Sequence, residues 1–151
     1  MTDRIKDILD DFSVLDDWED RYRYVIELGK TLAPLPEAEH TDANKVRGCA
    51  SQVWLQSDVD RSTNPPRLSW RGDSDAHIVR GLVALTLAFF NGRTPQEAIE
   101  GDALALYREI GLAEHLTPQR SNGVRAMVDR IKADARAELG DQALAPSTEG
   151  R

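Results

Sequence analysis

The first third of the chain places apolar residues at spacings of three and four, with charged residues between them. This pattern is typical of amphipathic helices that bury one face. It predicts one helix that ends near Val14 and a second helix that is capped by Asp17 and ends before Pro34. The apolar positions of the first helix are Ile5, Ile8, Leu9 and Phe12, and those of the second are Trp18, Tyr22, Val25, Ile26, Gly29 and Leu32.

The middle of the chain changes to a period of two. A polar segment with prolines, residues 33–46, is expected to form a surface loop. Residues 51–59 then alternate apolar and polar side chains, and residues 67–71 do so again after a turn, which predicts an antiparallel hairpin. The segment Gly72-Asp73-Ser74-Asp75 is expected to end the second strand. Two strands alone are marginally stable, so helices must cover one face of the sheet.

Helical spacing returns in the second half of the chain. A helix up to Asn91 carries a wide apolar surface and is predicted to be the central buried helix, with Asp73 or Ser74 as its cap. The segment Thr94-Pro95-Gln96-Glu97 has the pattern of a capping box with proline at the first helical position. It predicts a short helix, and residues 102–110 predict another.

The last helix is predicted to begin at Thr117-Pro118 and to end near Leu139, with Gly140 as its stop. Residues 140–151 have no large apolar residue after Leu144, so they are predicted to be a disordered tail behind one domain over residues 1–139. The fold class that follows is α+β, in which a small antiparallel β-sheet packs against several helices.

Charge and apolar content restrict the partners and the location of the protein. The net charge of -7 and the pI of about 4.9 argue against a general phosphate-binding surface, so no nucleic-acid partner is expected. The longest apolar run, from Gly81 to Phe90, is too short to span a membrane, and acidic residues throughout residues 1–30 argue against a signal peptide. We therefore expect no membrane partner and a cytoplasmic location, in which a thiol stays reduced.

Cys49 is the only cysteine of the chain. A lone cysteine is most often a small buried hydrophobic residue, and it cannot form an internal disulfide or a dithiol pair. The histidines, at His40, His77 and His115, have no second ligand at a metal-binding spacing, so no metal site is expected. A cysteine hydrolase would need a histidine near Cys49 in space, which the sequence neither places there nor excludes.

The residues around Cys49 would suit a reactive thiol. Gly48 gives the backbone freedom to turn, while Lys45, Arg47 and the distant Arg120 are cations that could stabilise a thiolate. Such support matters because a free cysteine is mostly protonated at neutral pH. The alternative is that these cations are ordinary solvated loop charges and that the glycine only serves a turn.

Several sequence blocks resemble the SufE family of sulfur acceptor proteins in the same order along the chain. The resemblance covers roughly residues 3–139, and it departs from some family members at Ala50, where they carry glutamine. The blocks are Trp18-Glu19, Arg21-Tyr22, Ile26-Glu27-Leu28-Gly29, Gly48-Cys49-x-Ser51-Gln52-Val53-Trp54, Gly72-Asp73-Ser74-Asp75-Ala76, Ile78-Val79, Gly81-Leu82, Thr94-Pro95 and His115-Leu116-Thr117-Pro118-x-Arg120-Ser121-x-Gly123.

The resemblance implies a SufE/IscU-like α+β fold and a persulfide-forming Cys49. In this role the thiol accepts sulfur from a SufS-like, pyridoxal-phosphate-dependent cysteine desulfurase, stimulates that enzyme and delivers the sulfur to a SufBCD-like scaffold for iron–sulfur cluster assembly. The protein is then a sulfur-transfer accessory rather than an enzyme, and it needs no cofactor or metal of its own, because one accessible thiolate suffices for exchange.

The resemblance also assigns roles to the residues around the thiol. A loop over residues 47–51 is expected to hold Cys49 inward and to swing out on docking. The thiol loop with its possible thiolate support comprises Lys45, Arg47, Gly48, Ser51, Gln52 and Arg120, and the docking candidates are Gly72, Asp73, Ser74 and Asp75.

Two alternatives stay open at the level of sequence. One is a CsdE-like acceptor that serves a different desulfurase and feeds tRNA modification. The other is a binding module in which Cys49 is only structural.

Overall fold

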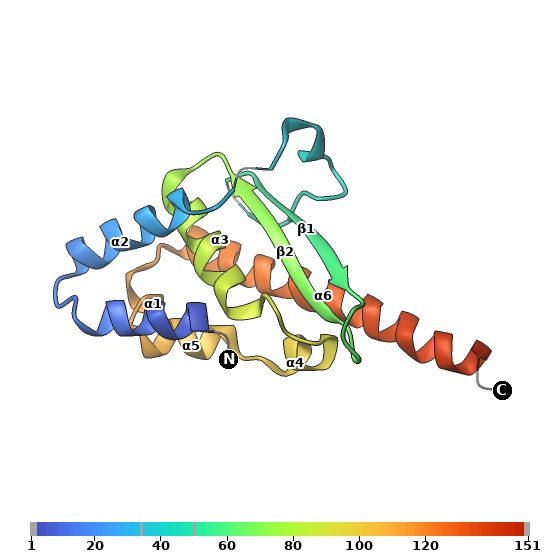
Figure 1. The fold of residues 1–151 in the computed structure, drawn as a ribbon. Coiled ribbons are helices and arrows are strands. Elements are labelled where there is room, and N and C mark those ends of the chain that lie inside the picture. The colour runs from blue at the N-terminus through green and yellow to red at the C-terminus, as the bar shows by residue number, and fades with distance from the viewer. Residues whose placement is uncertain (1–2, 34, 50, 150–151) are drawn as a thin grey trace.

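The structure, a computed structural model, describes residues 3–33, 35–49 and 51–149 (Figure 1). Within these ranges a two-stranded antiparallel sheet packs against α-helices, which confirms the α+β class. The elements in chain order are α1 (Asp3–Ser13), α2 (Trp18–Lys30), η1 (Glu37–Glu39), β1 (Val53–Asp60), β2 (Arg67–Ser74), α3 (His77–Phe90), α4 (Pro95–Glu100), α5 (Ala103–Glu109), η2 (Ala113–His115) and α6 (Pro118–Glu149).

Two helix starts that the sequence predicts, those of α2 and α4, are present in the structure. The carboxylate of Asp17 accepts a hydrogen bond from the backbone N–H of Glu19 and caps α2. Thr94 and Glu97 form a reciprocal capping box at the start of α4. These bonds satisfy backbone N–H groups that have no partner inside the helix, so the local sequence fixes where each helix begins.

The hairpin runs further than its alternation of side chains indicates. β1 and β2 pair from Val53 opposite Ser74 to Asp60 opposite Arg67. The prediction that residues 72–75 break the second strand is therefore wrong, since β2 continues through Ser74. The sequence predicts Gly72 as a strand breaker, but this glycine is required for packing: a Cβ at this position would lie 2.6 Å from Cγ1 of Val83 in α3. The glycine lets α3 pack closely on the strand without ending it.

The central helix α3 is buried along nearly its whole length, as the sequence predicts. Its N-cap residue is Ala76, which makes no side-chain cap, so the cap predicted at Asp73 or Ser74 is wrong. The backbone of α3 crosses α2 closely, because a Cβ on Gly81 would lie 2.0 Å from the carbonyl oxygen of Val25. The hairpin lies against another side of α3 (Figure 1).

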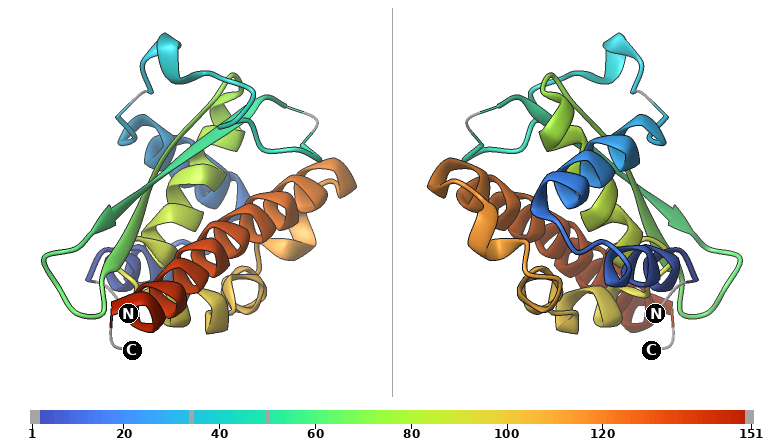
Figure 2. Two further views of the ribbon diagram at one scale, coloured as in Figure 1. Left: turned by 90° about the vertical axis from the view of Figure 1, so that its right-hand side faces the viewer. Right: turned by 90° about the vertical axis from the view of Figure 1, so that its left-hand side faces the viewer.

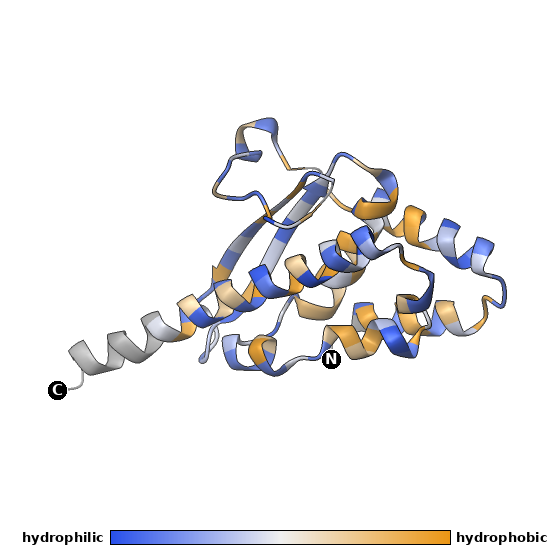
Figure 3. Cartoon of the chain, turned by 180° about the vertical axis from the view of Figure 1, so that it is seen from behind, coloured by the Kyte–Doolittle hydropathy of each residue, from blue (hydrophilic) through white to orange (hydrophobic). Residues whose placement is uncertain are grey.

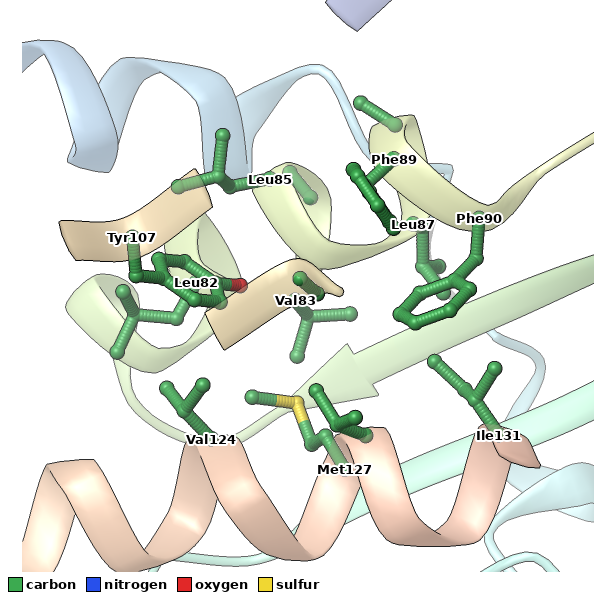
Figure 4. Close-up of a cluster of buried hydrophobic side chains, with 14 of the residues drawn as sticks. Leu82, Val83, Leu85, Leu87, Phe89, Phe90, Tyr107, Val124, Met127 and Ile131 are labelled. Carbon is green, nitrogen blue, oxygen red and sulfur yellow. The ribbon is translucent and has the colours of Figure 1, made fainter. Parts of the chain in front are cut away.

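The long helix α6 supplies the remaining wall of the core. Hydrophobic and hydrophilic residues alternate along it (Figure 3), and its side chains Val124, Met127 and Ile131 point toward α3 (Figure 4). This packing brings the first turns of α6 beside the loop that carries Cys49 (Figure 2).

The C-terminal end of α6 differs from the prediction. The helix continues through Gly140 to Glu149, so the stop expected near Leu139 is wrong. A glycine in an exposed helical position costs only about 1 kcal/mol and does not end a helix by itself. Gly140 is exposed, and it is not among the glycines with a positive φ. The separation of residues 140–151 from the domain stays a prediction, and residues 150–151 lie outside the described ranges.

Across the described part of the chain, no helix combines the length and the apolar character that a membrane crossing requires.

Candidate functional site

The loop that carries Cys49 is fastened at both of its ends. At its start, the guanidinium of Arg130 in α6 donates to the carbonyl oxygens of Ala43 and Lys45 at 2.8 and 3.3 Å. At its end, the backbone N–H of Gln52 donates to the carboxylate of Asp75 at 3.1 Å. The free part of the loop is therefore short and centred on the thiol.

The thiol of Cys49 points toward α6 and is half-buried. Its Sγ donates a hydrogen bond to the carbonyl oxygen of Gly123 at 3.5 Å. Gly48 has a φ of 92°, in the left-handed region that favours glycine, and a Cβ there would meet the Cβ of Ala126 at 3.4 Å. The glycine thus makes the turn that aims the next side chain at the helix.

A cavity of about 200 Å³ lies beside the Cys49 thiol. Its walls come from β1, from the core face of α3 and from the first turns of α6, whose side chains in this region are seen in Figure 4. The volume is several times the roughly 30 Å³ that a water molecule takes up in the liquid, so the cavity has room beside the thiol. The apolar lining residues are Val53, Val79, Leu82, Val124 and Met127, and the polar ones are Ser51, Thr117, Gln119 and Arg120.

Burial in this site raises the pKa of the Cys49 thiol, because the thiolate would lose solvation. The thiol therefore stays protonated at neutral pH in this conformation, which agrees with its role as a hydrogen-bond donor. Of the cations expected to support a thiolate, Arg120 lines the cavity. Lys45 and Arg47 line a different hollow, so the expected support from these two cations is not seen here.

Most of the segment proposed for docking is buried in the free chain, so its part in docking stays a prediction. Gly72, Asp73 and Ser74 are buried, and only Asp75 of this segment is exposed. In the free chain only a small part of Asp73 and Ser74 is open to a partner. Asp73 and Asp75 instead make contacts inside the chain, and the bond from Asp75 to Gln52 fastens the thiol loop.

Several residues of the site escaped the sequence analysis. Arg130 holds the loop, the Gly123 carbonyl holds the thiol, and Met127 lines the cavity. His40 stacks on Trp54 with ring centroids 4.0 Å apart. Of these residues, only Gly123 and Trp54 lie in the quoted family blocks, and their contacts could not be predicted because contacts between distant residues leave no local spacing pattern.

The surroundings of the thiol can also be compared with the needs of a hydrolase and of a metal centre. No histidine is among the residues that line the cavity, and the described residues contain no group of His, Cys, Asp or Glu that could hold a metal ion. Ala50, where the chain departs from some family members, lies outside the described ranges.

The protonated, half-buried thiol predicts slow alkylation. Iodoacetamide should modify Cys49 more slowly in the folded protein than in urea, and the ratio of the two rates should shrink at alkaline pH, where the thiolate forms in both states. The physical reason is that thiolate is the reactive form and burial raises the pKa of this thiol. Alkylation rates measured by mass spectrometry across a pH series would check this, and equal rates in the folded and unfolded protein would contradict it.

Comparison with known proteins decides the family. The family model described as the SufE Fe-S metabolism associated domain matches residues 6–135. The chain belongs to the SufE family. An uncharacterized SufE-like protein of Rhizobium meliloti (strain 1021) is 55% identical over 132 residues, which cover 87% of this chain and 94% of that protein.

A second relative agrees with this SufE assignment, and a solved structure matches the fold. An uncharacterized SufE-like protein of Rhizobium etli is 56% identical over 129 residues, which cover 85% of this chain and 87% of that protein. The solution structure of a hypothetical protein from Thermus thermophilus matches the fold with a TM-score of 0.72, at 24% identity over 91% of this chain and 96% of that one. As a SufE domain, the chain has an accessory, sulfur-related role in Fe-S metabolism, which implies interaction with a cysteine desulfurase.

Proposed function

We propose that this SufE protein accepts sulfane sulfur on Cys49 from the persulfide of a SufS-like cysteine desulfurase. The observation that carries the proposal is a lone thiol beside a cavity of about 200 Å³, on a short loop fastened at both ends. Sulfur exchange needs one thiol and room for a second sulfur atom. The chain then passes the sulfur to a SufBCD-like scaffold for cluster assembly in the cytoplasm and, by removing persulfide, stimulates the desulfurase.

The transfer step is a thiol exchange. Cys49 first loses its proton, and its thiolate then attacks the outer sulfur of the desulfurase persulfide. A sulfur–sulfur bond forms on Cys49 while the bond inside the donor persulfide breaks. The donor cysteine leaves as a thiolate and takes up a proton. No net oxidation occurs, so neither a cofactor nor an oxidant is needed on this chain. The pyridoxal phosphate that forms the donor persulfide belongs to the desulfurase.

The loop must move for this step to occur. In the resting conformation burial raises the pKa of the thiol, and the Sγ faces a helix carbonyl. Such a thiol is protected from oxidants but reacts slowly. Docking would therefore bring the loop over residues 47–51 outward, where the thiolate is solvated and the thiol can ionise. Amide exchange over residues 45–52 should rise when the desulfurase binds, and unchanged exchange would contradict this movement.

Intact-mass analysis tests the proposed function. After incubation with a SufS-like desulfurase and cysteine, the wild-type protein should gain the mass of one sulfur atom or more, and peptide mapping should place it on Cys49. Treatment with a reducing agent should remove it. The SufS-like desulfurase should be tested beside a cysteine desulfurase of a different type, since preferential loading by the second enzyme would favour the CsdE-like role. Absence of added mass with either enzyme, or sulfur found away from Cys49, would overturn the proposal.

A further inference from the structure

A second hollow lies on the other side of the Cys49 loop from the sulfur cavity. Its lining comes from residues 45–48 and from a different face of α6. We call it the basic hollow, because its charged lining residues are Lys45, Arg47, Arg125, Arg130 and a single acidic residue, Asp129. The hollow measures about 500 Å³ and is open to solvent, so it has the size and access for side chains of a partner.

The cations of the basic hollow differ in what they already bind. The charge of Arg130 is paired with Asp134 at 3.2 Å, and its other N–H groups hold the thiol loop. Lys45, Arg47 and Arg125 form no ion pair with any carboxylate in the described part of the chain. Three positive charges in one concave surface thus face at most one negative charge, that of Asp129.

This concentration of positive charge contrasts with the rest of the protein. The chain carries a net charge of -7, so a surface chosen at random should be acidic. Like charges held in a hollow repel one another, and a ligand with carboxylates would relieve that repulsion. The net charge of -7 disfavours long-range attraction to the phosphate backbone of a nucleic acid.

From this we infer that the basic hollow docks an acidic segment of the desulfurase, whose carboxylates pair with Arg47 and Arg125. The inference rests on the proposed sulfur-acceptor function and specifies the surface that recognises the donor. Arg47 and Gly48 directly precede Cys49 and line the hollow, while Cys49 itself lines the cavity on the other side. A segment bound in the hollow would therefore contact the thiol loop without covering the thiol.

Charge reversal tests the inference through the association rate. A double variant, Arg47→Glu with Arg125→Glu, should associate with the desulfurase about 10-fold more slowly at low salt, while the dissociation rate changes little. Its association rate should also lose most of its dependence on salt. Because association precedes sulfur chemistry, this readout is separate from any effect on the thiol. The matched control is Lys6→Glu with Arg136→Glu, two exposed cations outside the hollow, and it should stay within about 2-fold of wild type.

The outcomes separate the two hypotheses. If the wild-type protein neither binds the desulfurase nor acquires sulfur, the proposed function fails. If it does both and the double variant associates at the wild-type rate, the docking inference alone is overturned. It is also overturned if the control variant slows association equally, which would indicate a nonspecific charge effect, or if the double variant loses binding to an RNA oligonucleotide but keeps its association with the desulfurase.

Discussion

Replacement of Cys49 with serine is expected to abolish both sulfur acceptance and stimulation of the desulfurase. A serine hydroxyl does not ionise near neutral pH and cannot form a stable persulfide, so no sulfur can be held at this position. The fold should survive, because a hydroxyl is smaller than the thiol and this position is only half-buried. We expect the free energy of unfolding to stay within about 1 kcal/mol of wild type.

Three properties of Cys49→Ser should be measured on the same preparation. Turnover of the desulfurase with the variant should equal that of the enzyme alone, added sulfur mass should be absent, and binding to the desulfurase should persist. The binding measurement distinguishes loss of the thiol from loss of the interaction with the desulfurase. A folded variant that still stimulates the desulfurase would show that Cys49 is only structural, and the binding-module alternative would then replace the sulfur carrier.

Local chemistry explains which parts of the fold could be predicted from the sequence. The caps at Asp17 and Thr94 depend on residues within one helical turn, and the burial of α3 follows from its own apolar surface. The errors lie where a glycine is predicted as the end of an element. Gly72 is a strand residue that makes room for α3, and Gly140 stays helical because nothing requires it to adopt a positive φ.

The candidate site was predictable only in part. The ordered family blocks identified Cys49, and the glycine before it predicted a turn. The cavity is assembled from β1, α3 and α6, so its shape depends on tertiary packing that no local pattern encodes. Lys45 and Arg47 precede the thiol in sequence, yet the positive φ of Gly48 turns the chain so that they line a different hollow. Their closeness to Cys49 in sequence therefore does not bring their charges to the cavity beside the thiol.

Asp73 shows how a residue of a family block can serve the fold rather than a surface. Its carboxylate accepts a hydrogen bond from the backbone N–H of Ser74 at 2.8 Å. One of its oxygens lies 3.4 Å from Nε of Arg80, and the other lies 3.3 Å from Nε2 of His40. The Nε of Arg80 is buried and has no hydrogen bond among the described residues, so Asp73 is its charge partner. The carboxylate thus links β2, α3 and the loop before the thiol.

Asp73→Ala is therefore expected to lower the free energy of unfolding by about 3 kcal/mol, because it leaves a buried guanidinium nitrogen without its counter-charge. For a chain of this size the midpoint of thermal unfolding should fall by about 10 °C. Asp73→Asn keeps an oxygen for the Ser74 N–H and should cost less, about 1 to 2 kcal/mol. Urea and thermal unfolding followed by circular dichroism would measure both changes.

The control for Asp73 is Asp58→Ala, which removes an exposed carboxylate from the same hairpin. Its side chain is 58% exposed and lies 3.6 Å from Arg71, so its loss should change the stability by less than about 1 kcal/mol. At a temperature where Asp73→Ala is folded, it should still acquire sulfur on Cys49, since the carboxylate does not line the cavity. If Asp73→Ala instead keeps wild-type stability and loses only desulfurase binding, the residue belongs to the docking surface after all, and its burial in the free protein must be relieved when the partner binds.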